Sequence, residues 1–235
     1  ATLRLICLAL LSILLTACQP AAEQKQPPAD TGTVDTTVAP PPEPEPPPPP
    51  PIDYDSSAWT ELTRLDRSII IDMKYATAEN FVKKKMYDCP RCFLRPEVAQ
   101  AVVRAHRALQ QQGLGLKLYD CYRPLPVQWE LWNTVSIPGY VADPRKGSMH
   151  NRGSAVDLTI VDAQGQELPM GTAFDFFGPE AHYAYAQLPD SVRQNRMLLR
   201  ETMAAHGFRP IRTEWWHFSF SRKNYALSDM LWKCY

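Results

Sequence analysis

The chain has 235 residues, of which 45% are hydrophobic and 21% charged, and its formal net charge at pH 7 is zero. This length can bury a sizeable core, and a neutral charge balance gives no support for a nucleic-acid partner. Thirteen of the 23 prolines fall between residues 19 and 51. We therefore predict that the first 51 residues lie outside the fold and that one domain follows over residues 52–235.

The first 18 residues have the pattern of an export signal. Arg4 precedes an apolar run over residues 5–15 that is too short to span a bilayer. The four residues LTAC, which end at Cys18, resemble the bacterial lipobox, in which the cysteine is lipidated and becomes the mature N-terminus. We expect a lipoprotein signal peptide over residues 1–18, and a plain secretory signal or a short anchor is the alternative.

Residues 19–51 are rich in Pro, Ala, Gln and Thr, and from Pro40 the sequence reads PPPEPEPPPPPP. Such a segment cannot bury enough apolar surface to fold, and its proline tract favours polyproline II. A tract of this kind can serve as a ligand of an SH3-type domain. Beside a lipid anchor we expect instead a disordered spacer that holds the domain away from the membrane.

Two strands and two helices are predicted before residue 136. The β-branched run Ser68 to Met73 indicates a strand. A helix is predicted over residues 95–112, because Pro96 suits its first turn and Gly113 follows its end. The next two elements are a short strand over residues 116–119 and a short helix over residues 128–135, whose Trp129 and Trp132 are expected to face inward.

The second half of the domain adds four strands and one helix. Residues 155–161 alternate in the pattern of a strand, and the turn signal DAQG after them predicts a hairpin with residues 167–170. Asp190 is expected to cap a helix through Ala205, and two last strands are predicted over residues 208–211 and 215–220. Because helices separate the strands only twice, we predict an α+β fold with an antiparallel central sheet flanked by helices.

Four cysteines follow the predicted signal peptide, and they are Cys89, Cys92, Cys121 and Cys234. Export to an oxidising compartment makes disulfides the expected state, and four cysteines allow three full pairings. The spacing of Cys89 and Cys92 also fits half a zinc site or a redox pair. With no second pair and no nearby histidine, we favour a structural bond or free thiols.

The stretch SMHNRGSAVDLT, residues 148–159, predicts part of a metal site. Its His150 and Asp157 can meet across a turn into the strand that follows. The motif EWWHF supplies His217 as a third donor, and a catalytic zinc takes three such ligands and leaves a fourth position for water. Glu214 is then a candidate general base. In a regular strand Glu214 and His217 face opposite sides, so a turn or bulge is required near Glu214.

Three motifs in this order, YDCYRP, SMHNRGSAVDLT and EWWHF, closely resemble those of the VanX-type D-alanyl-D-alanine dipeptidases. These are zinc peptidases with the D,D-carboxypeptidase and hedgehog-like fold. The resemblance implies one zinc per domain, held by His150, Asp157 and His217, with Glu214 as the catalytic base. It also implies that Arg123 stabilises the transition state, whereas on its own this arginine reads as a surface charge or a structural ion pair.

Further positions follow from the same resemblance. Ser148 matches a residue that helps to hold the carboxylate of the substrate, Asp175 one that pairs with its free ammonium group, and Tyr75 one whose backbone lines the pocket. A pocket tyrosine of the family falls at Cys89, which departs from the pattern and leaves the dipeptide preference open. His182 and His206 lie outside the motifs and are expected to be ordinary helix or surface residues.

The resemblance implies hydrolysis of D-alanyl-D-alanine or a close D-dipeptide. One alternative is a D,D- or L,D-carboxypeptidase that trims longer peptidoglycan stem peptides, and Trp215 and Asp175 favour the dipeptidase over it. An alternative of another class is a non-catalytic envelope-binding module, which would be expected to lose Glu214 or a metal ligand. The export signal predicts a site of action in the cell envelope, on the extracytoplasmic side, with a role in peptidoglycan turnover.

Overall fold

The computed structural model describes residues 51–135 and 140–234. The predicted signal peptide, Cys18 and nearly all of the predicted spacer lie outside these residues. No helix in the described part of the chain combines the length and the apolar character needed to cross a membrane.

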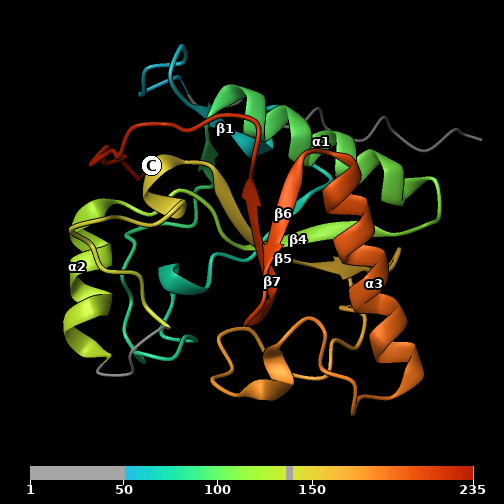
Figure 1. The fold of residues 1–235 in the computed structure, drawn as a ribbon. Coiled ribbons are helices and arrows are strands. Elements are labelled where there is room, and N and C mark those ends of the chain that lie inside the picture. Colours follow the sequence, from blue (N-terminus) through green and yellow to red (C-terminus); the bar gives the residue numbers. More distant parts are fainter. Residues whose placement is uncertain (1–50, 136–139, 235) are drawn as a thin grey trace, which may run out of the picture. The chain divides into compact units, whose positions relative to one another are not determined.

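A five-stranded sheet forms the centre of the fold (Figure 1), with the strand order β2-β4-β5-β7-β6. Its strands are β2 (Ile70–Ile71), β4 (Gly115–Asp120), β5 (Ala155–Val161), β6 (Phe208–Ile211) and β7 (Glu214–Phe220). All neighbours are antiparallel except β2 and β4, which pair in parallel. The α+β class and the mainly antiparallel sheet are thus confirmed, with the short parallel edge strand as a departure.

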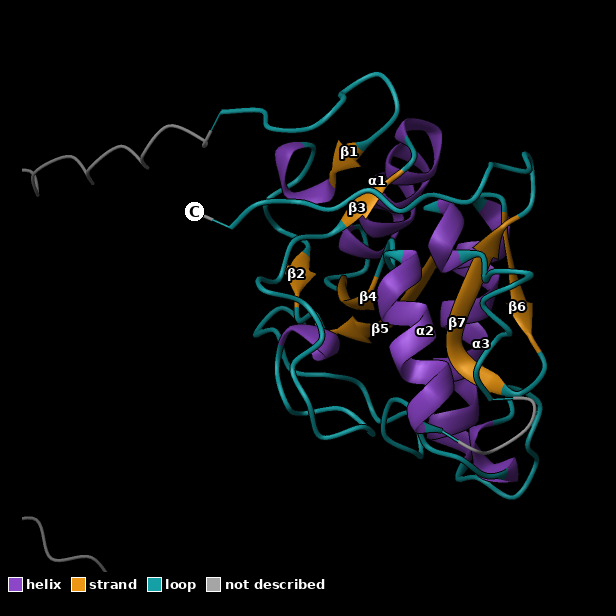
Figure 2. Cartoon of the chain, turned by 90° about the vertical axis from the view of Figure 1, so that its left-hand side faces the viewer, coloured by secondary structure: helices purple, strands orange, loops and turns teal. Residues whose placement is uncertain are grey.

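A second sheet has two antiparallel strands, β1 (Thr60–Glu61) and β3 (Phe93–Leu94). The helices are α1 (Pro96–Gln110), α2 (Leu125–Thr134) and α3 (Asp190–Ala205). Helices α1 and α3 contact each other and the large sheet. Helix α2 stands on the other side of β5 and β7, and in Figure 2, viewed from that side, it lies in front of the sheet.

The two faces of β5 show why the sheet has a polar site on one side. Val156 and Leu158 belong to the hydrophobic core, whereas Asp157 lines a cavity. This two-residue alternation turns the apolar side chains toward the layer of α1 and α3 and turns Asp157 the other way. The core therefore fixes the strand that carries the candidate site.

Several local predictions were wrong. Trp129 is 40% exposed and does not face inward, because α2 buries Gln128 and Leu131 instead. The strand predicted over residues 68–73 is confined to two residues. The predicted hairpin after β5 is reduced to one isolated bridge between Val161 and Glu167.

The helix at Asp190 also differs from its prediction. Asp190 is its first residue, Pro189 occupies the cap position, and no side-chain cap bond forms. The acidic side chain still lies in the first turn, where the helix dipole favours negative charge.

The four cysteines form two disulfides, Cys89–Cys234 and Cys92–Cys121. The neighbours Cys89 and Cys92 therefore pair with different distant partners. This arrangement confirms a structural bond and excludes a redox pair or half a zinc site within CPRC.

Candidate metal centre

Two neighbouring strands bring the first two donors together. Asp157 of β5 lies directly opposite His217 of β7 in the register of the sheet. Directly opposed residues point to the same face, so their side chains meet. Oδ1 of Asp157 is 2.9 Å from Nδ1 of His217, and both residues are buried.

The third donor comes from a turn just before β5. His150 begins a 3-10 turn that ends at Gly153, whose backbone has a φ of 67°. A Cβ at Gly153 would overlap the ring of Trp59, so only glycine fits this position. The turn reverses the chain and places Nε2 of His150 3.3 Å from Oδ2 of Asp157 and 3.1 Å from Nδ1 of His217. The predicted meeting across a turn is confirmed.

One nitrogen of each imidazole has an outer hydrogen-bond partner, and the other nitrogen of each ring faces Asp157. Nδ1 of His150 donates to the carbonyl of Cys121 at 2.7 Å, and Nε2 of His217 lies within hydrogen-bond distance of Oγ of Ser219, at 3.0 Å. Such outer partners fix the ring orientation and the tautomer of metal-binding histidines. Nε2 of His150 and Nδ1 of His217 are the ring nitrogens that face Asp157 and could bind a metal.

The distances between the donor atoms fit a small tetrahedral ion. His150, Asp157 and His217 form a group that could hold a metal. Nδ1 of His217 lies 2.9 Å from Oδ1 of Asp157 and 3.1 Å from Nε2 of His150, and Nε2 of His150 lies 3.3 Å from the other carboxylate oxygen, Oδ2. Ligands about 2.0–2.1 Å from a tetrahedral zinc are separated by roughly 3.3 Å. Two imidazoles and one carboxylate make up a donor set that zinc prefers and leave a fourth position open. The expected zinc cofactor is thus accommodated by these three residues.

The environment of Asp157 keeps its carboxylate ready to bind a cation. Burial opposes its ionisation, but the imidazoles of His150 and His217 outweigh this effect and hold the pKa of Asp157 well below its ordinary value. The group is therefore ionised at neutral pH, as a metal ligand must be.

Glu214 reaches the same centre because β7 is irregular. Pro210 of β6 pairs with Phe218 of β7, yet the next residue, Ile211, pairs with Glu214. This shift in register is the predicted break in the strand. It brings Oε2 of Glu214 to 3.9 Å from Nδ1 of His217. Burial raises the pKa of Glu214 to about 7, with the negative charge of nearby carboxylates as a lesser cause, so this carboxyl can exchange a proton near neutral pH.

Arg123 lines the same cavity and is not a surface charge, since it is only 8% exposed. Its Nε and one terminal nitrogen donate to Oδ2 of Asp120 at 3.0 and 2.7 Å, and the other donates to Gln128 at 3.0 Å. The hydroxyl of Tyr87 donates to the second oxygen of Asp120 at 2.8 Å. Asp120, Gln128 and Tyr87 were not predicted from the sequence. Of these three, only Asp120 could have been suspected from the sequence, because it is an acid at the end of a predicted strand, three residues before Arg123.

The remaining predicted residues also line this cavity of about 590 Å³, and they are Ser148, Asp175 and Tyr75. Oγ of Ser148 accepts the backbone N–H of His150 at 3.1 Å. The hydroxyl of Tyr75 donates to Asp175 at 2.8 Å, and its backbone carbonyl accepts the N–H groups of Met86 and Tyr87. Burial, followed by the charge of Asp157, raises the pKa of Asp175 to about 8. Asp175 has a φ of 57°, an uncommon conformation for a non-glycine residue that is often found at functional sites.

Three further residues considered in the sequence do not line the cavity. Neither His182 nor His206 is among the described residues that line the cavity, and nor is Cys89. Cys89, where the resemblance places a pocket tyrosine, is held in a disulfide with Cys234.

Comparisons with known proteins agree with this geometry. A family model described as D-ala-D-ala dipeptidase matches residues 56–231. A D-alanyl-D-alanine dipeptidase of Escherichia coli is 35% identical over 77% of this chain and 94% of its own length. One of Enterococcus faecium is 33% identical over 72% of this chain and 95% of its own. On these matches, the chain belongs to the D-ala-D-ala dipeptidase family of peptidases.

Proposed function

We propose that this chain is a zinc-dependent dipeptidase that hydrolyses D-alanyl-D-alanine or a close D-dipeptide to free amino acids. The observation that carries the proposal is the position of Asp175 in the same cavity as His150, Asp157 and His217. An acid in the cavity besides Asp157 and Glu214 suits a substrate whose ammonium group is on the residue that carries the scissile carbonyl. The names of the curated relatives support the same substrate.

Each side chain has a distinct proposed role. Zinc, when bound to His150, Asp157 and His217, supplies Lewis-acid polarisation of the scissile carbonyl and promotes ionisation of water. Glu214 takes the proton of the attacking water and returns it to the leaving amine. Arg123 stabilises the negative charge that develops on the carbonyl oxygen.

The two ends of the substrate are assigned to two further residues. Asp175 binds the free ammonium group, and the cation of the substrate restores the ionised state that burial opposes. Ser148 contributes to holding the terminal carboxylate. Tyr75, through its hydroxyl, orients the carboxyl of Asp175.

The test compares substrates that differ only at the amine end. The full chain is assayed with D-Ala-D-Ala, with N-acetyl-D-Ala-D-Ala, and with a tripeptide that ends in D-Ala-D-Ala. A dipeptidase is expected to have a kcat/KM for the free dipeptide at least about 100-fold above those for the other two, because they leave Asp175 without its cation. Preference for the tripeptide or the acetylated compound would instead identify a carboxypeptidase of longer stem peptides, and binding without turnover of any of the three compounds by the zinc-loaded chain would identify a non-catalytic module.

We also propose that the domain over residues 52–235 acts outside the cytoplasm, anchored by a lipid on Cys18 and held off the membrane by residues 19–51. The signal-like start and the lipobox-like LTAC support this assignment. Two disulfides are compatible with an oxidising compartment. Since D-Ala-D-Ala for wall synthesis is made in the cytoplasm, an exported enzyme would act in peptidoglycan turnover or scavenging and would not by itself confer glycopeptide resistance.

A further inference from the structure

The two disulfides differ in their relation to the metal centre. Cys92 precedes β3 and Cys121 follows β4, and both are almost fully buried. The carbonyl of Cys121 is the acceptor for Nδ1 of His150. This disulfide therefore ends on a residue that directly contacts a metal ligand.

The segment from Asp120 to Arg123 contacts the site at three successive points. Asp120 binds the guanidinium of Arg123, the carbonyl of Cys121 binds the His150 ring, and the backbone N–H of Arg123 donates to the carbonyl of His150 at 3.2 Å. A displacement of this segment would thus move both a metal ligand and the arginine. The position of this segment therefore affects the geometry of the metal site directly.

The Cys92–Cys121 bond fixes this segment to the small sheet. Beside it, the N–H of Tyr122 donates to the carbonyl of Phe93 at 3.0 Å, and the carbonyl of Cys92 accepts the N–H of Leu62 at 2.9 Å. The disulfide adds a covalent link at the middle of this hydrogen-bonded junction. The junction holds the Cys121 carbonyl at a set place relative to the His150 turn.

We propose that the Cys92–Cys121 disulfide is a positioning element of the metal site, so that zinc binds more tightly to the chain when this disulfide is formed. The physical basis is that outer hydrogen-bond partners of metal-ligating histidines contribute to metal affinity, and their loss typically weakens it 10- to 100-fold. The inference rests on zinc binding at His150, Asp157 and His217. It concerns metal affinity rather than hydrolysis, so it can fail while the proposed dipeptidase activity stands.

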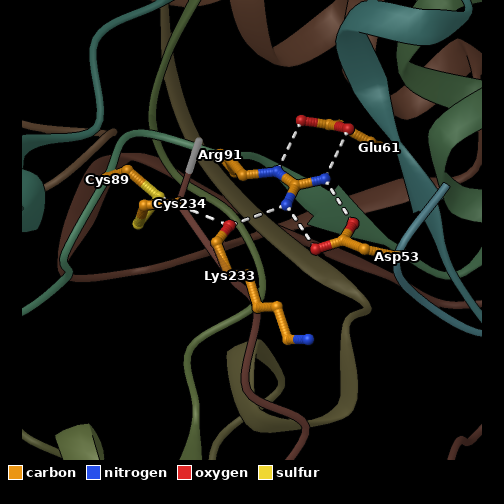
Figure 3. The surroundings of a disulfide bond; sticks show 6 residues. All are labelled: Asp53, Glu61, Cys89, Arg91, Lys233 and Cys234. Atoms are coloured by element: carbon orange, nitrogen blue, oxygen red, sulfur yellow. Dashed lines mark hydrogen bonds and ion pairs between the residues drawn. A yellow bond between two sulfur atoms is a disulfide. The ribbon is translucent and has the colours of Figure 1, made fainter. Parts of the chain in front are cut away.

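The second disulfide provides a matched control (Figure 3). Cys89–Cys234 links the chain near its end to the segment before β3. Beside it, Arg91 bridges Asp53 and Glu61 and donates to the carbonyl of Lys233 at 2.8 Å. None of the residues drawn in Figure 3 is among those that line the metal-site cavity. Reduction of the Cys89–Cys234 disulfide is therefore expected to lower the stability of the fold without moving His150.

The first experiment uses the unmodified full chain and depends on the reciprocity of linked equilibria. If the disulfide strengthens zinc binding, zinc must make that disulfide harder to reduce by the same factor. The chain is equilibrated in glutathione redox buffers with and without saturating zinc, and each disulfide is quantified by thiol alkylation and mass spectrometry. Zinc is expected to shift the midpoint of Cys92–Cys121 to more negative potential by about 30 mV for each tenfold in zinc affinity, and to leave Cys89–Cys234 unchanged. An unmoved Cys92–Cys121 midpoint, or equal shifts of both disulfides, would overturn the inference.

The second experiment uses paired variants. The Cys92→Ser/Cys121→Ser variant is expected to bind zinc 10- to 100-fold more weakly in chelator competition, whereas Cys89→Ser/Cys234→Ser should stay within about twofold of the unmodified chain. Circular dichroism establishes that each variant is folded. Should the first variant fail to fold, the single Cys92→Ser variant takes its place, with the same expected weakening of zinc binding. The redox titration of the unmodified chain tests the inference independently of either variant. A folded variant without the Cys92–Cys121 bond that keeps the original zinc affinity would contradict it.

Discussion

Oε2 of Glu214 lies 3.9 Å from Nδ1 of His217, although the two residues stand at an odd offset along β7. In a regular strand they would face opposite sides of the sheet. The shift in pairing between β6 and β7 removes this conflict and places a carboxyl beside the metal donors. The carboxyl is thus near the centre and separate from the three-donor set, which is the position a general base requires.

Glu214→Gln should retain zinc and lose turnover. The amide keeps the shape of the side chain but cannot carry a proton, and general acid–base groups typically contribute 10²- to 10⁴-fold in rate. The measurements are metal content and kcat of the full chain with D-Ala-D-Ala. A near-normal kcat would remove Glu214 from the mechanism.

Arg123→Lys should lower kcat at least tenfold while KM changes less and zinc is retained. Lysine keeps the charge but cannot reproduce the planar set of bonds to Asp120 and Gln128. The charge-preserving change is chosen because Arg123→Ala would leave Asp120 buried and uncompensated, at a cost of roughly 3–5 kcal/mol in stability. Arg145→Lys, at an exposed pair with Asp143, is the matched control and should leave both constants unchanged. A change confined to KM in Arg123→Lys would limit this arginine to substrate binding.

Asp175→Asn should become progressively more stable, relative to the unmodified chain, as pH rises. The pKa of Asp175 is raised from 3.8 to about 8 in the folded state. Between these values the native chain holds a proton that the unfolded chain releases, so this group destabilises the fold increasingly from about pH 4 to pH 8. Asparagine does not ionise and removes that dependence. Thermal unfolding of both zinc-free proteins at several pH values measures it, with roughly 2–4 °C expected per kcal/mol.

Added zinc provides the control for this titration. A bound cation favours the ionised carboxylate, so the difference between Asp175→Asn and the unmodified chain should shrink when zinc is present. A stability difference that is constant with pH would show that Asp175 does not titrate with a raised pKa.

Cys18→Ser should release the protein from the membrane fraction without loss of dipeptidase activity. The thioether-linked lipid cannot form on serine, and a Pro-rich spacer separates this residue from the described fold. Cell fractionation and immunoblotting measure the distribution, and activity is assayed in each fraction. Finding the unmodified protein in the cytosol, or glycopeptide resistance on its expression, would contradict the proposed location and role.

Much of the metal centre follows from the sequence because its donors stand in short motifs whose residue types fit a zinc site. The alternation along β5, the turn before it and the odd offset in EWWHF were enough to predict which side chains meet and where the strand must break. The partners of Arg123 could not be predicted in this way. Gln128 belongs to a helix, and which side of that helix faces the core depends on tertiary packing. The exposure of Trp129 has the same cause.

The disulfide pairing was also beyond local reasoning. Cys89 and Cys92 are three positions apart, yet their partners are 145 and 29 residues away. Such pairings depend on how the small sheet and the chain end pack together, which no motif records. The parallel pairing of β2 with β4 likewise depends on the path between strands and not on their residue patterns.

The most direct test of the account is whether D-alanine is released from D-Ala-D-Ala by the full chain in a zinc-dependent way. We predict turnover by the zinc-loaded protein, loss of turnover after chelation, and recovery when zinc is restored, with L-Ala-L-Ala uncleaved. His217→Ala should bind no zinc and should not recover, whereas His206→Ala, at the end of α3, should behave as the unmodified chain. Undiminished hydrolysis by the zinc-free protein, or a full equivalent of zinc in His217→Ala, would contradict the account.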